Sequence, residues 1–428
     1  TRTVDLPAYS IFELAPADGV QNISIRTRTC TILSYTFGQI YDRTIPEPRK
    51  ELPDFKKVKG AQELYLEGVH MQQYRSPEYS GETCWLEALS REPDFAPACI
   101  ALAEYYLGKF RYGDALGMAE RAERSLTRFN ERPESGKVRY LKGLALLGLE
   151  QWQAAYDALA QAAWNTDAVC AACFHMGLLD LRAENYESAC THFVRSLGSN
   201  NSCVPARAFL GWAQHLAGDD ENAEQTLQKA LVSDALDLYT HMFRALIKGD
   251  FMEFAKNIHT DVTQTALDLA EYLLEAGAYS AVVSLFDGLE IVCPLDAMPH
   301  YVRKVLTGDG RVTQGEGIAF PSRAFELAVL RKVVADDPGD MRAHYLLGCL
   351  LYAKDFPAQA EQHFVLCAQG GDYRAWRNLA AITYTAHDDI PRAKECMRNA
   401  RSLAPAGEKQ IVFESAYLMA KTGDPPRT

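Results

Sequence analysis

The residues best placed to do chemistry lie in the segment ELYLEGVHMQQYR, residues 63–75. His70 and Tyr74 share one face of a predicted helix, because four residues make just over one turn. Gln73 and Arg75 add an amide and a guanidinium, a set that suits a sugar site or an interface with a neighbouring domain. No pair of carboxylates accompanies them, as general acid and base work on a glycoside requires. We therefore predict a sugar or domain-interface site with no catalytic residue; the alternative is a solvated helix end.

A second cluster resembles a metal or redox motif. Cys170-Ala-Ala-Cys173 has further cysteines and histidines close to it in sequence, namely Cys190, Cys203, His175 and His192. However, a zinc site usually has a second paired knuckle, and a redox pair usually opens a helix after a strand. Here the pair lies within a helical pattern, where Cys173 takes a regular packing position. The cysteines are interpreted as core residues, and neither a metal nor a cofactor is predicted.

Other catalytic and binding classes find no support in the sequence. It has no P-loop, dinucleotide-binding glycine motif, His-Glu-x-x-His or Gly-x-Ser-x-Gly elbow, so the chain alone is not expected to be an enzyme. Its 44 Lys and Arg against 56 Asp and Glu give a net charge of −12 without a basic run, which argues against a nucleic-acid partner.

The predicted location is the cytoplasm. No apolar run approaches the roughly 20 residues of a membrane helix, and no signal peptide opens the sequence. The eleven cysteines follow no disulfide framework, which indicates reduced thiols.

The elements that position these residues repeat every 34 residues. Small residues recur at this spacing: Gly143, Gly177 and Gly211, then Ala155, Ala189 and Ala223, each alanine followed four positions later by Leu159, Phe193 or Leu227. A small residue where two antiparallel helices cross, with a large one where the next repeat docks, is typical of the tetratricopeptide repeat. Further copies fall at Gly68, Gly81, Trp85, Ala88 and Pro93; Ala103, Ala115 and Ala119; Ala270, Phe286 and Leu289; Gly348, Ala360 and Phe364; and Ala380, Ala393, Met397, Ala400 and Pro405, the last with one extra residue in its turn.

The predicted fold is an all-α, right-handed superhelix of about eight such units with a short N-terminal β segment. We expect the array over residues 63–428, with Gly68 opening the first helix and a C-terminal helix as a cap. Two stretches break the period, residues 236–262 and residues 294–322. The first reads as helix out of register, and in the second the glycine-rich segment TGDGRVTQGEGIAFPSR reads as a loop.

The N-terminal part has a different character. Residues 1–40 contain strand-like stretches, and residues 41–62 read as a linker rich in proline and charge. Two or three strands bury too little to be stable alone. They are expected either to pack on the helices or to belong to a preceding β domain.

In such arrays the first helix of each unit lines the concave surface. Counting from the crossing residues places an aromatic and apolar set there: Tyr140, Leu144, Phe174, Leu178, Trp212, His215, Tyr345 and Tyr352. Lys137 and Arg342 are exceptions at the rim, so a clamp for a peptide carboxylate is not expected. The predicted occupant is an apolar peptide, a partner protein or the chain's own N-terminal β domain. The alternative is that these rings only pack between neighbouring units.

Four phrases also resemble a known family. The stretches ELYLEGVHMQQYR, WLEALSREPDF, RSLTRFNERPESGKVRYLKGLAL and AAYDALAQAAWN are similar to the helical region of large bacterial proteins. In these proteins a galactose-mutarotase-like β domain of unknown function precedes tetratricopeptide repeats. The resemblance covers roughly residues 55–300. It departs at Ser76, where the family tends to have histidine, and most of the β domain is missing here.

The resemblance implies a link to carbohydrate use and a β domain that His70, Tyr74 and Arg75 would face. The predicted function is a protein-interaction scaffold. The alternative is the C-terminal half of a carbohydrate-binding or carbohydrate-active protein whose first repeat contributes to a sugar site.

Overall fold

The computed structural model describes residues 21–27, 29–38, 57–74, 80–309 and 319–423. Within these ranges it has two strands and 21 helices. The strands are β1 (Asn22–Arg26) and β2 (Thr31–Thr36). The helices are α1 (Ala61–Gln73), α2 (Gly81–Arg91), α3 (Ala96–Gly108), α4 (Tyr112–Leu126), α5 (Lys137–Gly148), α6 (Trp152–Ala162), α7 (Val169–Arg182), α8 (Tyr186–Ser199), α9 (Val204–Leu216), α10 (Asp220–Ser233), α11 (Leu238–Lys248), α12 (Phe251–Ala255), α13 (Val262–Glu275), α14 (Tyr279–Val292), α15 (Ala297–Thr307), α16 (Ala324–Asp336), α17 (Met341–Ala353), α18 (Pro357–Gln369), α19 (Tyr373–Thr385), α20 (Ile390–Leu403) and α21 (Lys409–Lys421).

Aspartates begin many of these helices. An aspartate carboxylate at the N-cap accepts a hydrogen bond from a backbone N–H of the first turn, which would otherwise have no partner. The residues in this role are Asp219, Asp237, Asp250, Asp261, Asp296, Asp340, Asp372 and Asp389. Part of the negative charge of the sequence therefore defines helix starts.

The predicted helix crossings are confirmed. A Cβ added to the crossing glycine would stand 2.6–2.7 Å from the large side chain of the second helix in four units, in the pairs Gly143–Leu159, Gly177–Phe193, Gly211–Leu227 and Gly348–Phe364. Glycine is needed there because any side chain would overlap its partner. The first unit follows the same rule, since a side chain at Gly68 would collide with the Trp85 indole. Gly68 therefore lies at a crossing inside α1. The prediction that Gly68 opens the first helix is wrong.

The turn inside each unit also repeats. In six units, the residue seven positions after the crossing residue has a positive φ. These residues are Phe110, Glu150, Glu184, Gly218, Gly277 and Asp355. In the α19 unit the residue with positive φ follows Ala380 by eight positions, at Asp388 (φ 52°). The extra turn residue predicted for this unit is therefore confirmed.

The two breaks in the period have different structures. The first holds α11 and the five-residue α12, and is helical as predicted. The second begins with α15, which is capped at its start by Asp296 and at its end by Gly308, whose φ is 71°. Residues 310–318 of the predicted loop lie outside the described residues. The described residues of the predicted loop after α15, 308–309 and 319–323, lie in no helix or strand, as predicted.

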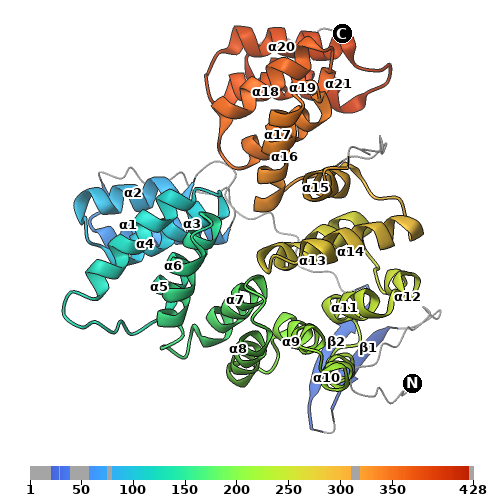
Figure 1. The fold of residues 1–428 in the computed structure, drawn as a ribbon. Coiled ribbons are helices and arrows are strands. Elements are labelled where there is room, and N and C mark those ends of the chain that lie inside the picture. Colours follow the sequence, from blue (N-terminus) through green and yellow to red (C-terminus); the bar gives the residue numbers. More distant parts are fainter. Residues whose placement is uncertain (1–20, 28, 39–56, 75–79, 310–318, 424–428) are drawn as a thin grey trace.

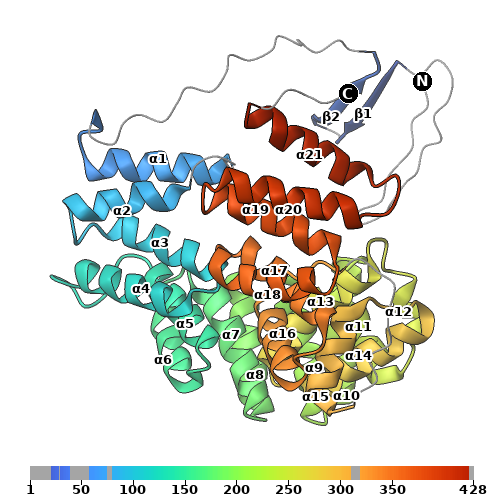
Figure 2. The ribbon, with the colours of Figure 1, turned by 90° about the horizontal axis from the view of Figure 1, so that it is seen from above.

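The stacked pairs turn through a closed circuit (Figure 1). From α1 the chain runs past α7 and α13 to α17, whose end lies beside the end of α3 in both views (Figure 2). The Lys354 ammonium donates to the Gly108 carbonyl at 3.1 Å across this junction. The largest apolar core is continuous from Phe174 in α7 to Leu418 in α21. None of the helices in the described ranges has the length and apolar character of a bilayer span.

The two strands form one antiparallel hairpin with unlike faces. Ile23 pairs with Tyr35 and Ile25 with Leu33, so these apolar side chains share one face. All four are exposed, Leu33 to 60%. The hairpin therefore does not bury its apolar face on the described helices, which was one of the two expectations for it.

Candidate functional site

Three of the predicted groove residues are buried. Phe174, Leu178 and Trp212 are 5%, 0% and 7% exposed. The Phe174 ring centre lies 4.9 Å from that of Tyr272 in α13, and the Trp212 ring stacks on Phe243 in α11 at 5.0 Å. These rings contact later helices of the same chain, so they offer no surface to a partner in this structure.

Polar contacts hold α13 on the same face. The His175 Nδ1 lies 2.6 Å from the Glu275 carboxylate, and its Nε2 lies 3.3 Å from the hydroxyl of the predicted groove residue Tyr140. The Arg182 guanidinium donates to the backbone carbonyls of Glu275 and Leu274 at 3.0 and 3.1 Å. These carbonyls lie in the last turn of α13, where backbone acceptors outnumber the helical N–H donors. The chain therefore covers the inner face of α7 with its own helix.

The pair His175–Glu275 makes stability depend on pH. Burial lowers the pKa of His175, but the charge and hydrogen bond of Glu275, with the charge of Glu271, outweigh burial, so the pKa is raised. The folded state then holds the proton more tightly than the unfolded state. The stabilisation is complete below the unfolded pKa of about 6.5 and is lost as the pH rises through the folded value.

We therefore expect His175→Gln to lower the free energy of unfolding by on the order of 1–3 kcal/mol at pH 6. The difference from wild type should shrink toward pH 9. Urea unfolding of both proteins between pH 6 and pH 9 measures it. A difference that stays constant or grows with pH would contradict this assignment.

The remaining predicted groove residues are half-buried. Leu144 packs at the edge of the core around α5 and α7. His215 is tied to Asp220, with 2.5 Å between Nδ1 and the carboxylate. The Tyr352 hydroxyl lies 3.1 Å from the Thr385 hydroxyl, which links α17 to α19.

An arginine pair on α19 was missed by the sequence analysis. Arg374 and Arg377 lie six and three positions before the crossing residue Ala380, as Arg342 and Tyr345 do before Gly348. The Arg374 guanidinium lies 4.7 Å from the centre of the Tyr345 ring, a cation–π distance. The same count that found Tyr345 would have found both arginines. Our expectation that inner positions hold almost no cations is therefore wrong for α19.

A carboxylate already sits on this arginine face. Arg377 binds the Glu414 carboxylate of α21 through two hydrogen bonds, both of 2.6 Å. Its Nη1 also donates to the Asn378 side-chain oxygen at 2.9 Å, and the Asn378 amide contacts the Cys349 thiol at 3.6 Å. Arg374 is paired with Asp372 at 2.8 Å but stays 54% exposed. The inner face of α17, α19 and α21 thus combines bidentate carboxylate binding with an aromatic ring.

The predicted sugar or domain-interface residues lie at the end of α1. His70, Gln73 and Tyr74 are exposed, and Arg75 lies outside the described residues. The His70 and Tyr74 ring centres are 4.5 Å apart, so the two rings are presented together, as their spacing predicted.

The cysteine cluster is arranged for packing. Cys173 is fully buried, and the Cys170 thiol lies 3.4 Å from the Ser196 hydroxyl. Among the described residues, no group of three or more histidines, cysteines or carboxylates is placed to hold a metal ion.

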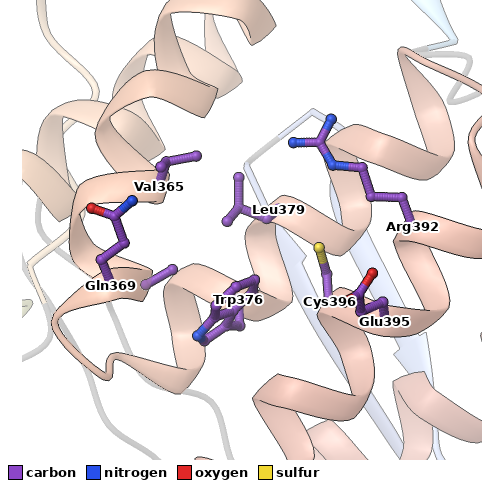
Figure 3. Close-up of a pocket in the computed structure, with 8 residues that line it drawn as sticks. Val365, Gln369, Trp376, Leu379, Arg392, Glu395 and Cys396 are labelled. Carbon is purple, nitrogen blue, oxygen red and sulfur yellow. The ribbon is translucent and has the colours of Figure 1, made fainter.

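A cavity of about 280 Å³ opens between α18 and α20. In Figure 3, Val365 and Gln369 lie on one side, Arg392 and Glu395 on the other, and Trp376 between them. Small-molecule sites usually exceed 300 Å³, so this cavity is slightly smaller than a usual metabolite site.

Comparisons with known proteins show only low sequence identity to this chain. No family model matches the chain. It is 24% identical over 269 residues to Superkiller protein 3 of Schizosaccharomyces pombe, which covers 56% of this chain. The chain spans about a fifth of that relative, 19% of its length.

Solved structures give similar low values. YrrB, described as a TPR protein with an unusual peptide-binding site, shows 20% identity and a TM-score of 0.36 over 43% of this chain and 92% of its own. PilF of Pseudomonas aeruginosa shows 17% identity and a TM-score of 0.38 over 52% and 96%. The assignment as a tetratricopeptide-like superhelix rests on the repeated crossings and turns described above.

Proposed function

We propose that the chain is a protein-interaction scaffold that holds an acidic segment of a partner on the inner face of α17, α19 and α21. The observation that carries this proposal is the pair Arg374 and Arg377 beside Tyr345, with Glu414 bound as a partner carboxylate would be. Charge-assisted, bidentate hydrogen bonds give such a face affinity and direction. The partner segment replaces or joins the internal carboxylates and lays an apolar side chain on the tyrosine.

This proposal departs from the sequence prediction, which placed an apolar occupant along the whole groove and expected no carboxylate clamp. The buried side chains of Phe174, Leu178 and Trp212 are covered by the chain itself. Tyr345 and Tyr352 are half-buried, and Arg374 beside Tyr345 is 54% exposed. The C-terminal units therefore provide the inner surface to which a partner has access. A cytoplasmic location is part of the proposal.

The test is the binding of fluorescent peptides with two or three carboxylates and one apolar residue, followed by anisotropy. We expect Arg374→Met to weaken binding at least about tenfold, because a hydrogen bond to a charged group contributes roughly 1.5–3 kcal/mol. Arg392→Met is the matched control, since Arg392 pairs with Glu361 at 2.9 Å beside the cavity between α18 and α20. Equal losses in both variants, or no binding of any acidic peptide, would refute the proposal.

A second candidate function is carbohydrate binding or β-domain docking at His70 and Tyr74. Their exposed, adjacent rings favour it, because sugars and domains both dock on such amphipathic rings. Calorimetric titration with a panel of sugars would show binding that is lost in His70→Ala. Heat changes that are equal in wild type and variant would argue against a sugar at this place.

A further inference from the structure

Two turns far apart in the sequence are tied together. The turn after α3 carries Lys109, and the turn after α17 carries Lys354 and Asp355. The Asp355 carboxylate forms an ion pair with Lys109 and accepts a hydrogen bond of 3.2 Å from the Tyr105 hydroxyl. In return, Lys354 donates to the Gly108 carbonyl at 3.1 Å. Stacked repeats require contacts only between neighbours, so these bonds serve another purpose than stacking.

The backbone at this junction is strained. Phe110 has a φ of 59°, and its ring centre lies 3.9 Å from the Lys354 ammonium. Equivalent turns use the polar residues Glu150, Glu184, Asp355 and Asp388, or glycine, at this position. A bulky side chain in the left-handed region is unusual, and such strain gathers at clamps and switches. Here the strained phenylalanine presents its ring to a lysine of the opposite turn.

The contacts are suited to opening. The Asp355 side chain is 57% exposed and that of Lys109 is 23% exposed, so solvent and salt weaken their attraction. Burial and the charge of the nearby Lys109 lower the pKa of Lys354. The charged form of Lys354 is therefore less favourable in the junction than in water. Contacts of this strength can hold the α3 and α17 turns together and still break readily.

We propose that this junction is a latch that keeps the superhelix closed in the free protein and opens to admit a partner. Opening separates the α3 and α17 units and widens access to the inner face that carries Arg374 and Tyr345. The part of this proposal in which opening controls access of a partner, here called gating, rests on the proposed function. The closed junction itself does not depend on it.

Zero-length carbodiimide coupling of the wild-type chain tests the closed state. It should join Lys109 to Asp355 and yield a cross-linked peptide that mass spectrometry identifies. Because the Debye length falls from about 10 Å at 0.1 M salt to 3 Å at 1 M, we expect the yield to drop about tenfold at 1 M NaCl. A yield that does not change with salt, or no cross-link at all, would overturn the latch.

Small-angle X-ray scattering tests opening. The double variant Lys354→Met, Asp355→Asn should have a larger radius of gyration than wild type, and asparagine keeps the left-handed turn. Asp388→Asn is the matched control, because Asp388 occupies the left-handed position of the α19 unit and should change nothing. An unchanged radius in the double variant would overturn the proposal.

The rate of peptide association separates the two proposals. If the latch gates the inner face, the double variant should bind the acidic peptide several-fold faster than wild type. A larger radius with an unchanged association rate would overturn gating and leave peptide binding intact. Absence of peptide binding, with the cross-link and the radius as expected, would refute only the proposed function.

Discussion

Replacing Phe193 by alanine is expected to lower the free energy of unfolding by about 3–5 kcal/mol. Phe193 is fully buried, and its ring fills the space left by Gly177 where α7 crosses α8. It also lies 5.9 Å from the Phe174 ring and 6.0 Å from the Phe209 ring. Alanine would remove these contacts and leave a cavity that two crossed helices cannot close.

The chain itself offers the matched control. Leucine fills the equivalent crossing in the units of Gly143 and Gly211, so Phe193→Leu should cost no more than about 1.5 kcal/mol. Urea unfolding followed by circular dichroism measures both variants. If alanine cost no more than the roughly 1.5 kcal/mol expected for leucine, the crossing would not need a large side chain, and the repeat assignment would lose its physical basis.

The repeat could be predicted because its determinants are local. In four units, the glycine at the crossing and the large residue sixteen positions later belong to one helix pair, so their spacing does not depend on the rest of the chain. The same rule explains the error at Gly68. Its partner Trp85 lies seventeen positions later, which hid the crossing from a count based on sixteen.

The state of the inner face could not be predicted in this way. Whether Phe174 and Trp212 face solvent depends on how sharply the superhelix turns at α11 and α12 and brings α13 back to α7. The curvature of the superhelix is the sum of small rotations between neighbouring units. The spacing of residues in the sequence does not determine these rotations. The contact between Lys109 and Asp355 depends on the same sum over the whole circuit.

The arginine face differs from both cases. Arg374 and Arg377 follow from the same local count as Tyr345, so the sequence contained the signal. Their partner could not be foreseen, because Glu414 reaches Arg377 only after α21 has docked on α19. Inner positions are therefore predictable residue by residue, while their accessibility requires the fold.

Replacing Glu326 by alanine is expected to cost about 3–5 kcal/mol, the usual loss when one partner of a buried ion pair is removed. Glu326 is fully buried, and its Oε2 accepts the backbone N–H groups of Ser322 and Arg323 at 2.7 Å each. Arg323 in turn donates to Asp268 and to the backbone carbonyl of Gln264 in α13. Alanine would leave the two backbone donors without an acceptor and would remove the ion pair with the Arg323 guanidinium, at the point where α16 attaches to α13.

A similar capping contact on the surface allows the local part of the lost stability to be measured separately from the contribution of the contacts with α13. Glu63 accepts the backbone N–H of Lys59 at 3.1 Å at the start of α1, so Glu63→Ala should cost only about 0.5–1 kcal/mol. Urea unfolding of both variants gives the comparison. If Glu326→Ala were no more harmful than Glu63→Ala, the buried carboxylate would cap only its own helix. The attachment of the C-terminal units to α13 would then have to come from apolar packing alone.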